Sequence, residues 1–534
     1  MIQPTFRILI ADKISADGLL PLQQDSRFEI VNRPGLTGED LARAVADADA
    51  VIVRSATKIS RATLTNPGRL KVIGRAGVGV DTIDVDAATE HGIAVLNAPS
   101  GNTISAAELA FALILALVRR VPAADRSMKQ GEWDRGRFSG TELHGKTMGL
   151  VGAGRIGGEV ARRARAFGMR VLVNDPYLNE ERARALEVEL APLEEVLRRA
   201  DVLSIHVPLT EGTAGLIGED QLSLMKPGAL LVNAARGGIV DEAALARALT
   251  ERRLGGAALD VFEQEPLAPD HPLRGLDNIV LTPHLGASTE EAQQNVALEI
   301  AEAVRDALLD GDLSKAVNAP AIGGDAMRRL RPLLDLAERL GRLAAALAPG
   351  GVSHAEVRYA GSAEDALRPL VASTLVGVLM PVVGERGVNF VNALHLAKTR
   401  GIEVQSTRLS PHGDYAEYIE LRLASREGDA RVAGTLLGEG HPRVVRIGDH
   451  QMNVTPIGAL VMIRNRDVPG VIGRVGTLLG DAGINIAEYH QARLEAGGDA
   501  FAVIRVDSRL AQAAIAALRQ LAEVLDVRQV QLGE

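Results

Sequence analysis

The chain has no cysteine among its 534 residues. This absence excludes disulfide bonds, a thiol nucleophile, covalent haem attachment and any metal site with thiolate ligands. A dense basic block is also missing, and 59 Lys and Arg stand against 68 Asp and Glu, for a net charge of −9. We therefore expect neither a nucleic-acid partner nor a metal site.

Long hydrophobic runs are lacking as well. The two most apolar stretches, residues 109–118 and 370–383, are shorter than the roughly 18 to 20 residues of a membrane-spanning helix, and the second contains Pro381. Residues 1–11 carry neither a basic leader nor a small-residue cleavage site, so no secretory signal is evident. Together with the missing cysteines, this predicts no membrane partner and a cytoplasmic location.

Length and composition indicate a globular protein of several domains. At roughly 150 residues per domain, the chain accommodates three or four. Hydrophobic residues make up 46% and charged residues 24%, which is too apolar for a largely disordered chain.

The amino-terminal part alternates short β-branched runs with longer helical stretches, which is typical of α/β proteins with parallel sheets. A long helix expected at about residues 105–120 separates two such units. The second unit has the order of a complete dinucleotide-binding fold. The expected strands are residues 7–11, 50–53, 72–73 and 94–96 in the first unit, and 147–151, 171–174, 202–206, 230–233, 257–259 and 280–282 in the second.

The character of the sequence changes at residues 317–324, where a proline and a glycine pair follow a helix expected at about residues 290–309. An Ala- and Leu-rich helical stretch, residues 327–348, comes next, in a region without a catalytic motif. From about Pro456 the expected order is β-α-β-β-α-β, which predicts a ferredoxin-like module.

The strongest single motif runs from Gly152 to Gly157, between an expected strand and an expected helix. The first glycine permits a tight turn, Gly154 lets the backbone approach a pyrophosphate, and Gly157 allows the helix and strand to pack closely. Arg155 and Ile156 open the helix, whose amino terminus favours phosphate. The motif predicts a dinucleotide site.

Asp175 ends the next expected strand, where its carboxylate can accept hydrogen bonds from the ribose hydroxyls of an adenosine. The residues that follow, Pro176 and Tyr177, include no arginine to bind a 2′-phosphate. The expected cofactor is therefore NAD rather than NADP.

Three polar residues lie at or near strand ends of the same unit: Arg236, Glu265 and His284. A histidine suits proton transfer near neutral pH, a carboxylate can orient its ring, and an arginine can hold a substrate carboxylate. Taken singly, the histidine is as readily structural, the arginine a solvated charge and the glutamate a turn residue. Their occurrence together after the NAD motif favours oxidation of a 2-hydroxy acid.

These motifs resemble those of the D-isomer-specific 2-hydroxyacid dehydrogenase family. The resemblance implies a Rossmann-type NAD domain inserted in a flavodoxin-like substrate domain, with Arg236, Glu265 and His284 as the catalytic set. It also implies cofactor contacts at Pro208, Ala235, Asp260 and Gly286. The segments that carry it are Gly152–Gly157, Asp175, His206–Thr210, Met225–Gly228, Arg236–Gly238, Asp260–Phe262 and Pro283–Gly286.

Within the family, the chain is similar to the long members that oxidise D-3-phosphoglycerate to 3-phosphohydroxypyruvate, the first step of phosphorylated L-serine biosynthesis. In those members an intervening α+β domain and a ferredoxin-like ACT domain follow the catalytic core. The segments involved are Val53–Lys58, Gly74–Asp81, Asn97–Thr103 and His284–Gln293. The implied domains are residues 1–98 with 292–318 for substrate, 99–291 for NAD, 319–452 for the intervening domain and 455–534 for the ACT domain.

A phosphorylated substrate requires cationic side chains, and the candidates are Arg54, Lys58, Arg75 and Arg135. Arg54 and Arg75 are the preferred pair, because a guanidinium matches phosphate geometry, although surface arginines are common. The resemblance adds Asn97, Ser100 and Gly101 as substrate contacts and suggests that Arg135 acts across a dimer contact.

In the last module, Asp467 precedes the first helix and Asn485 follows it. The resemblance makes them candidate contacts for an amino-acid effector, with L-serine feedback and a homotetramer as the expected regulation and assembly. The alternative is that Asp467 caps the helix and Asn485 occupies a turn.

Two other functions stay open at this point. One is the same chemistry on an unphosphorylated D-2-hydroxy acid. The other is a corepressor-like NAD sensor that binds partner proteins, which the complete set of Arg236, Glu265 and His284 disfavours.

Overall fold

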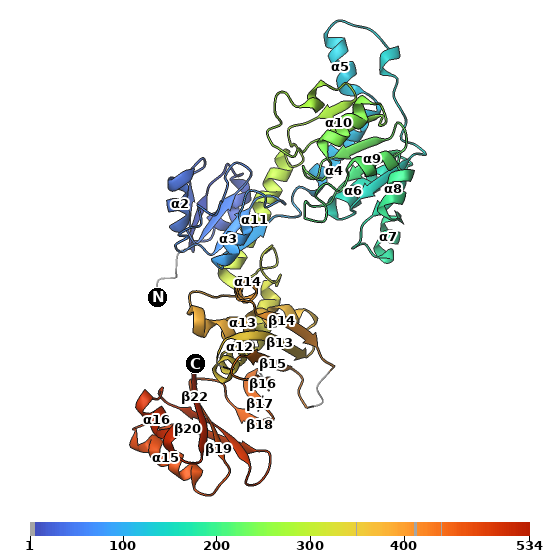
Figure 1. Cartoon of the computed structure of the whole chain (residues 1–534). Helices are drawn as coiled ribbons and strands as arrows, with labels where there is room; N and C mark the ends of the chain where they lie inside the picture. Colours follow the sequence, from blue (N-terminus) through green and yellow to red (C-terminus); the bar gives the residue numbers. More distant parts are fainter. Residues whose placement is uncertain (1–5, 349, 411–413, 439, 534) are drawn as a thin grey trace.

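The computed structural model describes residues 6–348, 350–410, 414–438 and 440–533. Four β-sheets follow one another along the chain, each with its own helices (Figure 1). The architecture confirms the predicted fold class. The predicted domain boundaries stay a prediction, and their ranges include residues 1–5, 349, 411–413, 439 and 534, which lie outside the described residues.

The first sheet is parallel, with strand order β2-β1-β3-β4-β5, the flavodoxin-like order. All four side chains of β3 are buried, as expected for a strand covered on both faces. The long helix α11 packs on this sheet although it follows the second sheet in sequence, so the unit is discontinuous (Figure 1). Its elements are β1 (Phe6–Ile10), η1 (Asp17–Leu19), α1 (Leu20–Gln23), β2 (Phe28–Asn32), α2 (Gly38–Ala46), β3 (Ala50–Val53), β4 (Val72–Arg75), α3 (Val85–Glu90), β5 (Ala94–Asn97) and α11 (Glu290–Asp310).

The second sheet has seven parallel strands in the order β12-β11-β10-β9-β6-β7-β8. The chain adds strands in one direction from β6 to β8 and in the other from β9 to β12. Ligands in such folds bind at this switch point, between β6 and β9. Its elements are α4 (Thr103–Val118), α5 (Val121–Lys129), η2 (Gly136–Phe138), β6 (Thr147–Val151), α6 (Arg155–Ala166), β7 (Arg170–Asn174), α7 (Glu180–Leu186), β8 (Glu189–Leu190), α8 (Leu193–Arg199), β9 (Val202–Ile205), α9 (Glu219–Leu224), β10 (Leu230–Asn233), α10 (Glu242–Thr250), β11 (Gly256–Leu259), η3 (Pro272–Gly275) and β12 (Ile279–Leu281).

Residues 119–140, which include α5, project from the second unit at the top of Figure 1. Large apolar side chains are exposed on this segment: Val121 (54%), Met128 (53%) and Trp133 (78%). We call it the projecting arm.

The third sheet, β14-β13-β15-β16-β17-β18, is covered on one face by α12 and α13. Leu336, Ala337 and Leu340 of α12 and Leu375 of α13 are almost fully buried in this layer. The elements are α12 (Gly324–Leu347), β13 (Val352–Ala360), η4 (Glu364–Ala366), α13 (Leu367–Val383), α14 (Ala393–Thr399), β14 (Glu403–Arg408), β15 (Tyr418–Ser425), β16 (Ala430–Leu437), β17 (His441–Ile447) and β18 (His450–Val454).

The length expected for the second apolar stretch was too short. The apolar stretch expected at residues 370–383 is part of a continuous helical segment, Glu364–Val383, and it is the one helix in the described part of the chain that is long and apolar enough to cross a membrane. The sequence estimate was too short because the polar residues before the stretch continue the helix. Since 67% of its apolar window is buried within the protein, the helix forms part of the core of this unit.

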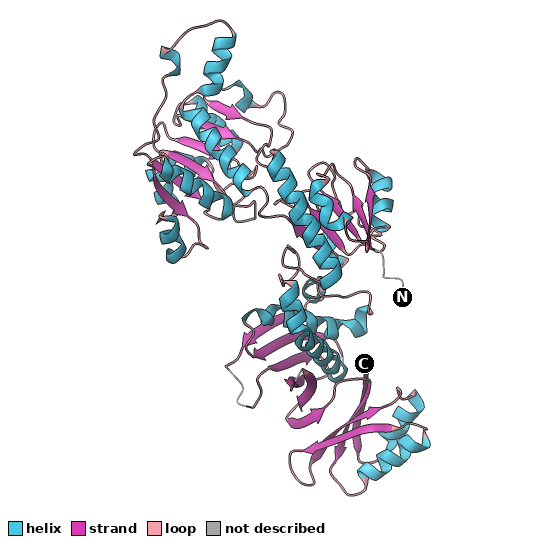
Figure 2. Cartoon of the chain, turned by 180° about the vertical axis from the view of Figure 1, so that it is seen from behind, coloured by secondary structure: helices cyan, strands magenta, loops and turns pink. Residues whose placement is uncertain are grey.

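The last sheet has the order β20-β21-β19-β22, and both helices lie on one face of it (Figure 2). This is the predicted β-α-β-β-α-β arrangement. Its elements are β19 (Ala459–Arg466), α15 (Val471–Asp481), β20 (Ile486–Arg493), β21 (Asp499–Val506), α16 (Gln512–Gln520) and β22 (Val524–Gln531).

Candidate active site

Two members of the predicted catalytic set face each other at one edge of the seven-stranded sheet. His284 Nδ1 lies 2.8 Å from Glu265 Oε2, and the side chains are 49% and 37% exposed. Because the glutamate is bound at Nδ1, Nε2 is the ring atom that can take a proton from a substrate hydroxyl. Glu265 Oε1 accepts the Phe262 amide at 3.1 Å, which fixes the carboxylate.

A buried carboxylate holds the loop that carries His284. The φ of His284 is +56°, a left-handed conformation that is uncommon for a residue other than glycine. Asp260 accepts the amides of Leu285 at 2.7 Å and Gly286 at 2.9 Å, and the Thr282 hydroxyl at 2.6 Å. These bonds fix the loop on both sides of His284 and so maintain its backbone conformation.

The cofactor contact predicted for Asp260 stays a prediction. The side chain is 0% exposed and its oxygens already accept three hydrogen bonds. In this structure Asp260 supports the loop that carries His284, because its buried carboxylate binds that loop on both sides of the histidine.

Arg236, the third member of the predicted set, follows β10 and reaches the amino-terminal unit. Its Nε lies 3.4 Å from Asp81 Oδ2, and its Nη1 donates to the Ala235 carbonyl at 2.7 Å. Asp81 was not among the predicted site residues, although it closes the motif Gly74–Asp81. The acidic residue two positions after Gly79 was the available signal.

Arg75, at the end of β4, is largely buried close to Arg236 and Arg54. Burial, and then the charges of Arg236 and Arg54, lower the pKa of the Arg75 guanidinium to about 10. Its buried Nε has no hydrogen-bond partner among the described residues. Three guanidinium groups with an unsatisfied buried donor favour an anionic ligand with several oxygen atoms.

The other predicted cations lie elsewhere on the surface. Lys58 is exposed, and Arg135 is exposed on the projecting arm. Within this single chain, neither is brought into the cluster formed by Arg54, Arg75 and Arg236.

The predicted contacts Asn97, Ser100 and Gly101 have structural partners. Asn97 donates to the Val78 carbonyl at 2.7 Å, so it holds the loop between Arg75 and Asp81. The Ser100 and Gly101 amides both donate to Glu299 on α11, at 3.0 Å each. These two amides are therefore bound by a carboxylate of the protein, and their contact with substrate stays a prediction.

Glu299 is a site-supporting residue that the sequence did not reveal. Burial raises its pKa, but the Lys315 ammonium and the two amides outweigh burial, and the pKa is lowered overall. Glu299 Oε1 lies 2.7 Å from Lys315 Nζ. Nothing in the local sequence of α11 distinguishes this glutamate from its exposed neighbours.

The predicted dinucleotide loop joins β6 to α6. Gly152 has φ +92°, and a Cβ on Gly157 would lie 2.2 Å from the Gly152 carbonyl oxygen, so both positions require glycine. A Cβ on Gly154 would meet nothing within 4 Å, which leaves space for a pyrophosphate at the start of α6. Arg155 and Ile156 are the first residues of that helix.

Asp175 lies beside this loop, just after β7. Its Oδ2 accepts the Ala153 amide and its Oδ1 the Tyr177 amide, each at 2.9 Å. A cavity of about 250 Å³ adjoins the carboxylate, where an adenosine would lie. The cavity is lined by Val173, Asn174, Asp175, Pro176, Leu190, Ala191 and Pro192.

The remaining predicted cofactor contacts lie after neighbouring strands. Pro208 is exposed after β9, Ala235 follows β10, and Gly286 follows β12. His206, also after β9, is partly buried with Nε2 2.9 Å from Ser204 Oγ, and burial lowers its pKa to about 4. These residues share the carboxyl edge of the sheet with Gly154 and His284.

The two predicted regulatory residues have partners that the sequence did not indicate. Asp467 accepts from Arg493 Nη1 at 2.7 Å, and Asn485 donates to Asp507 Oδ2 at 2.7 Å. The residue before α15 is Gly470, and it makes no side-chain cap, so Asp467 is not the helix cap of the alternative interpretation. The ligand contacts of Asp467 and Asn485 stay a prediction.

Three family models match the chain. They are the D-isomer specific 2-hydroxyacid dehydrogenase NAD binding domain over residues 111–286, the D-3-phosphoglycerate dehydrogenase intervening domain over 329–448, and the ACT domain over 459–523.

Curated relatives match over nearly their whole length. D-3-phosphoglycerate dehydrogenase of Bacillus subtilis is 41% identical, over 99% of this chain and 100% of the relative. The enzyme of the same name from Synechocystis sp. is 41% identical, over 98% of this chain and 95% of the relative. That from Mycobacterium tuberculosis is 42% identical, over 94% of each.

Solved structures match over the length of a catalytic core. A glyoxylate reductase from Paecilomyes thermophila is 31% identical with a TM-score of 0.55, over 59% of this chain and 98% of that one. D-Lactate dehydrogenase from Escherichia coli is 28% identical with a TM-score of 0.52, over 58% and 99%.

Proposed function

This chain belongs to the D-isomer specific 2-hydroxyacid dehydrogenase family, as a member with the intervening and ACT domains of D-3-phosphoglycerate dehydrogenases, and we propose how its residues carry out the reaction. It is an NAD-dependent oxidoreductase that converts D-3-phosphoglycerate to 3-phosphohydroxypyruvate, at the entry to L-serine biosynthesis. The assignments of individual residues below are our proposal.

NAD, when bound, accepts a hydride from the C2 atom of the substrate. His284 Nε2 removes the proton of the C2 hydroxyl as the hydride leaves. Glu265, 2.8 Å from Nδ1, orients the ring and stabilises the imidazolium that forms. Arg236 binds the substrate carboxylate and the developing carbonyl oxygen.

Arg54 and Arg75 bind the phosphate of the substrate. The support is the buried Arg75 guanidinium, which has an unsatisfied Nε and two other arginines beside it. A phosphate supplies several acceptor oxygens and negative charge to such a cluster. This binding would select against unphosphorylated D-2-hydroxy acids, which are the alternative substrates.

The Gly152–Gly157 loop and the start of α6 bind the pyrophosphate of NAD, and Asp175 binds the adenosine ribose. The open space at the Cβ position of Gly154 and the cavity beside Asp175 support this placement. Gly286, Ala235 and Pro208 line the same edge.

The observation that carries the proposal is the His284–Glu265 pair, at 2.8 Å, in the same unit as the dinucleotide loop. The test is NADH formation with D-3-phosphoglycerate and with unphosphorylated D-2-hydroxy acids. A preference for the phosphorylated acid that is lost in Arg75→Ala supports it. Equal activity on both classes favours the alternative substrate, and no activity on any acid favours an NAD sensor.

A homotetramer is the proposed assembly. The projecting arm exposes Val121, Met128 and Trp133, which a second copy of the chain would cover. Sedimentation analysis of wild type and Met128→Glu tests this, because a charge on the arm should dissociate that contact.

L-Serine is the proposed effector, with Asp467 and Asn485 as candidate contacts. A ligand would have to displace Arg493 and Asp507 from these side chains. Inhibition by L-serine that is lost in Asp467→Ala, with basal activity kept, would support this; activity indifferent to L-serine would assign the module to assembly or another effector. A cytoplasmic location is part of the same proposal and is tested by cell fractionation.

A further inference from the structure

Asp12, at the carboxyl end of β1, is a buried carboxylate beneath the segment that carries Arg54. It is 4% exposed. Its Oδ2 accepts the amide of Arg54 at 2.5 Å and the amide of Thr57 at 3.2 Å, and its Oδ1 accepts the Thr57 hydroxyl at 2.6 Å. One side chain therefore fixes both ends of residues 54–57.

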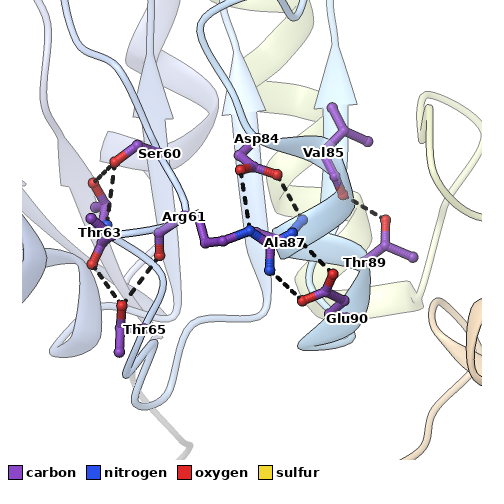
Figure 3. Close-up of polar contacts among 10 residues, drawn as sticks. Ser60, Arg61, Thr63, Thr65, Asp84, Val85, Ala87, Thr89 and Glu90 are labelled. Carbon is purple, nitrogen blue, oxygen red and sulfur yellow. Dashed lines mark hydrogen bonds and ion pairs between the residues drawn. The ribbon is translucent and has the colours of Figure 1, made fainter.

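The continuation of this segment has anchors of its own. Arg61 reaches α3, where it pairs with Glu90 at 2.6 Å and lies 3.8 Å from Asp84, while Ser60 and Thr63 close a local turn (Figure 3). These contacts, together with the backbone bonds of Ile59 to Thr82 and Asp84, fix the chain from Ile59 onward. Arg54 directly follows β3, so its backbone is held by that strand on one side and by the carboxylate of Asp12 at its own amide.

A second buried carboxylate, in the same unit, has different partners from those of Asp12. Asp49, 2% exposed at the amino end of β3, accepts the Arg7 amide at 2.9 Å, is bound by Arg69 at 2.6 Å and lies 3.5 Å from Lys71 Nζ. Asp12 has no ion pair among the described residues and receives hydrogen bonds only from two amides and a hydroxyl. Its charge acts on the cluster above it, where it offsets the repulsion of Arg75 by Arg54 and Arg236.

We propose that Asp12 is a positioning residue for the phosphate of the substrate, which holds the Arg54 backbone so that its guanidinium lies beside Arg75. The inference rests on the proposed function, in which these two arginines bind the phosphate. Small displacements of a binding group are costly, since misplacement by about 1 Å can reduce activity by about 10²-fold.

The experiment compares Asp12→Ala with Asp49→Ala in the full-length enzyme. Both variants lose a buried acceptor, so both should lower Tm. Asp12→Ala should also raise the KM for D-3-phosphoglycerate about tenfold, while kcat and the KM for NAD change by less than about twofold. Asp49→Ala should leave all three constants unchanged. A KM that rises equally in both variants, or in neither, overturns the proposal.

Asp12→Asn separates geometry from charge. Its oxygen can accept both amides, and its NH₂ can donate to Thr57 Oγ1, which then donates to the Ala11 carbonyl 3.0 Å away. The KM should stay within about threefold of wild type, so rescue by asparagine supports positioning. A tenfold rise in Asp12→Asn, equal to that of Asp12→Ala, would show that charge alone matters and would overturn the inference.

A double-mutant cycle connects Asp12 to Arg54. If Asp12 acts through Arg54, adding Asp12→Ala to Arg54→Ala should not raise the KM further. Effects that multiply contradict this coupling. If Arg54→Ala and Arg75→Ala leave the KM unchanged, the assignment of the phosphate site is wrong, and the role of Asp12 is wrong with it. If these two variants raise the KM but Asp12→Ala does not, the phosphate site is supported and the role of Asp12 is overturned.

Should Asp12→Ala yield no folded enzyme, Asp12→Glu makes the same test. The longer side chain keeps the charge but displaces the carboxylate by one methylene. The KM should rise, because the Arg54 amide would have to move. An unchanged KM in Asp12→Glu would overturn the proposal.

Discussion

Arg236 lies so close to Gly79 that a Cβ on this glycine would be 2.1 Å from the Nη2 atom of the guanidinium. The two residues belong to different units, since Gly79 follows β4 of the five-stranded sheet and Arg236 follows β10 of the seven-stranded sheet. The pairing of Arg236 with Asp81 at 3.4 Å strengthens this contact. Arg236 therefore packs directly on the backbone of the other unit.

Gly79→Ala should displace Arg236 and reduce kcat/KM for D-3-phosphoglycerate by about 100-fold. Binding of the reduced cofactor, measured by the change in NADH fluorescence, should be retained, because the dinucleotide loop is untouched. Gly275→Ala is the matched control, since a Cβ there would meet nothing within 4 Å. Activity close to wild type in Gly79→Ala would mean that Arg236 does not need its observed position.

His284→Ala should lower kcat by about 10³-fold with little change in NAD affinity, because it removes the proton acceptor. Glu265→Gln should cost less, about 10- to 100-fold, since the amide oxygen can still accept from Nδ1 but carries no charge to stabilise the imidazolium. Steady-state kinetics and NAD titration make the comparison. Parallel losses of turnover and NAD affinity in His284→Ala would argue for a structural role of the histidine.

Asp175→Ala should reduce the preference for NAD over NADP. The carboxylate repels a 2′-phosphate, so its removal should lower the KM for NADP, while the loss of ribose contacts should raise the KM for NAD about tenfold. The ratio of kcat/KM for the two cofactors is the measurement. An unchanged ratio would place the adenosine ribose away from Asp175.

The sequence predicted the positions of those site residues that directly follow a strand of the sheet. The glycines of the dinucleotide loop, Asp175 and His284 each follow a strand, and parallel strands place their carboxyl ends at one edge. Asp260 was predicted from the family resemblance, and its bonds to the loop that carries His284 were not foreseen. Whether a carboxylate after a strand faces the cleft or lies beneath a loop depends on the path of that loop, here Thr282–Gly286.

The contacts that the sequence did not predict join distant segments of the chain. Glu299 binds the amides of Ser100 and Gly101 across 199 and 198 positions of the chain, and Asn318 donates to Ile93 across 225. Asp467 was paired with an effector or a helix amide, whereas it binds Arg493 on the next strand. No local pattern encodes such pairings, because they arise only when the units pack.

The partly buried His206 gives the NAD-binding unit a pH-dependent stability. Burial lowers the pKa of His206 from 6.5 to about 4, so the folded unit binds a proton less readily than the unfolded chain. The contribution is fully present above pH 6.5 and is lost as the pH falls toward 4. At pH 5 the loss relative to pH 7 is about 2 kcal/mol, or about 4 to 8 °C in Tm for a unit of this size.

His206→Gln should remove the pH-dependent part of the stability that His206 contributes, because glutamine keeps a polar atom near Ser204 but does not titrate. Calorimetry at pH 7 and pH 5 measures it, and the transition that NAD raises identifies the unit. Carboxylates elsewhere titrate equally in both proteins, so the difference between wild type and variant isolates the histidine. If the two lose the same stability between pH 7 and pH 5, the imidazole is protonated in the folded state at pH 5 and is not held neutral by its burial.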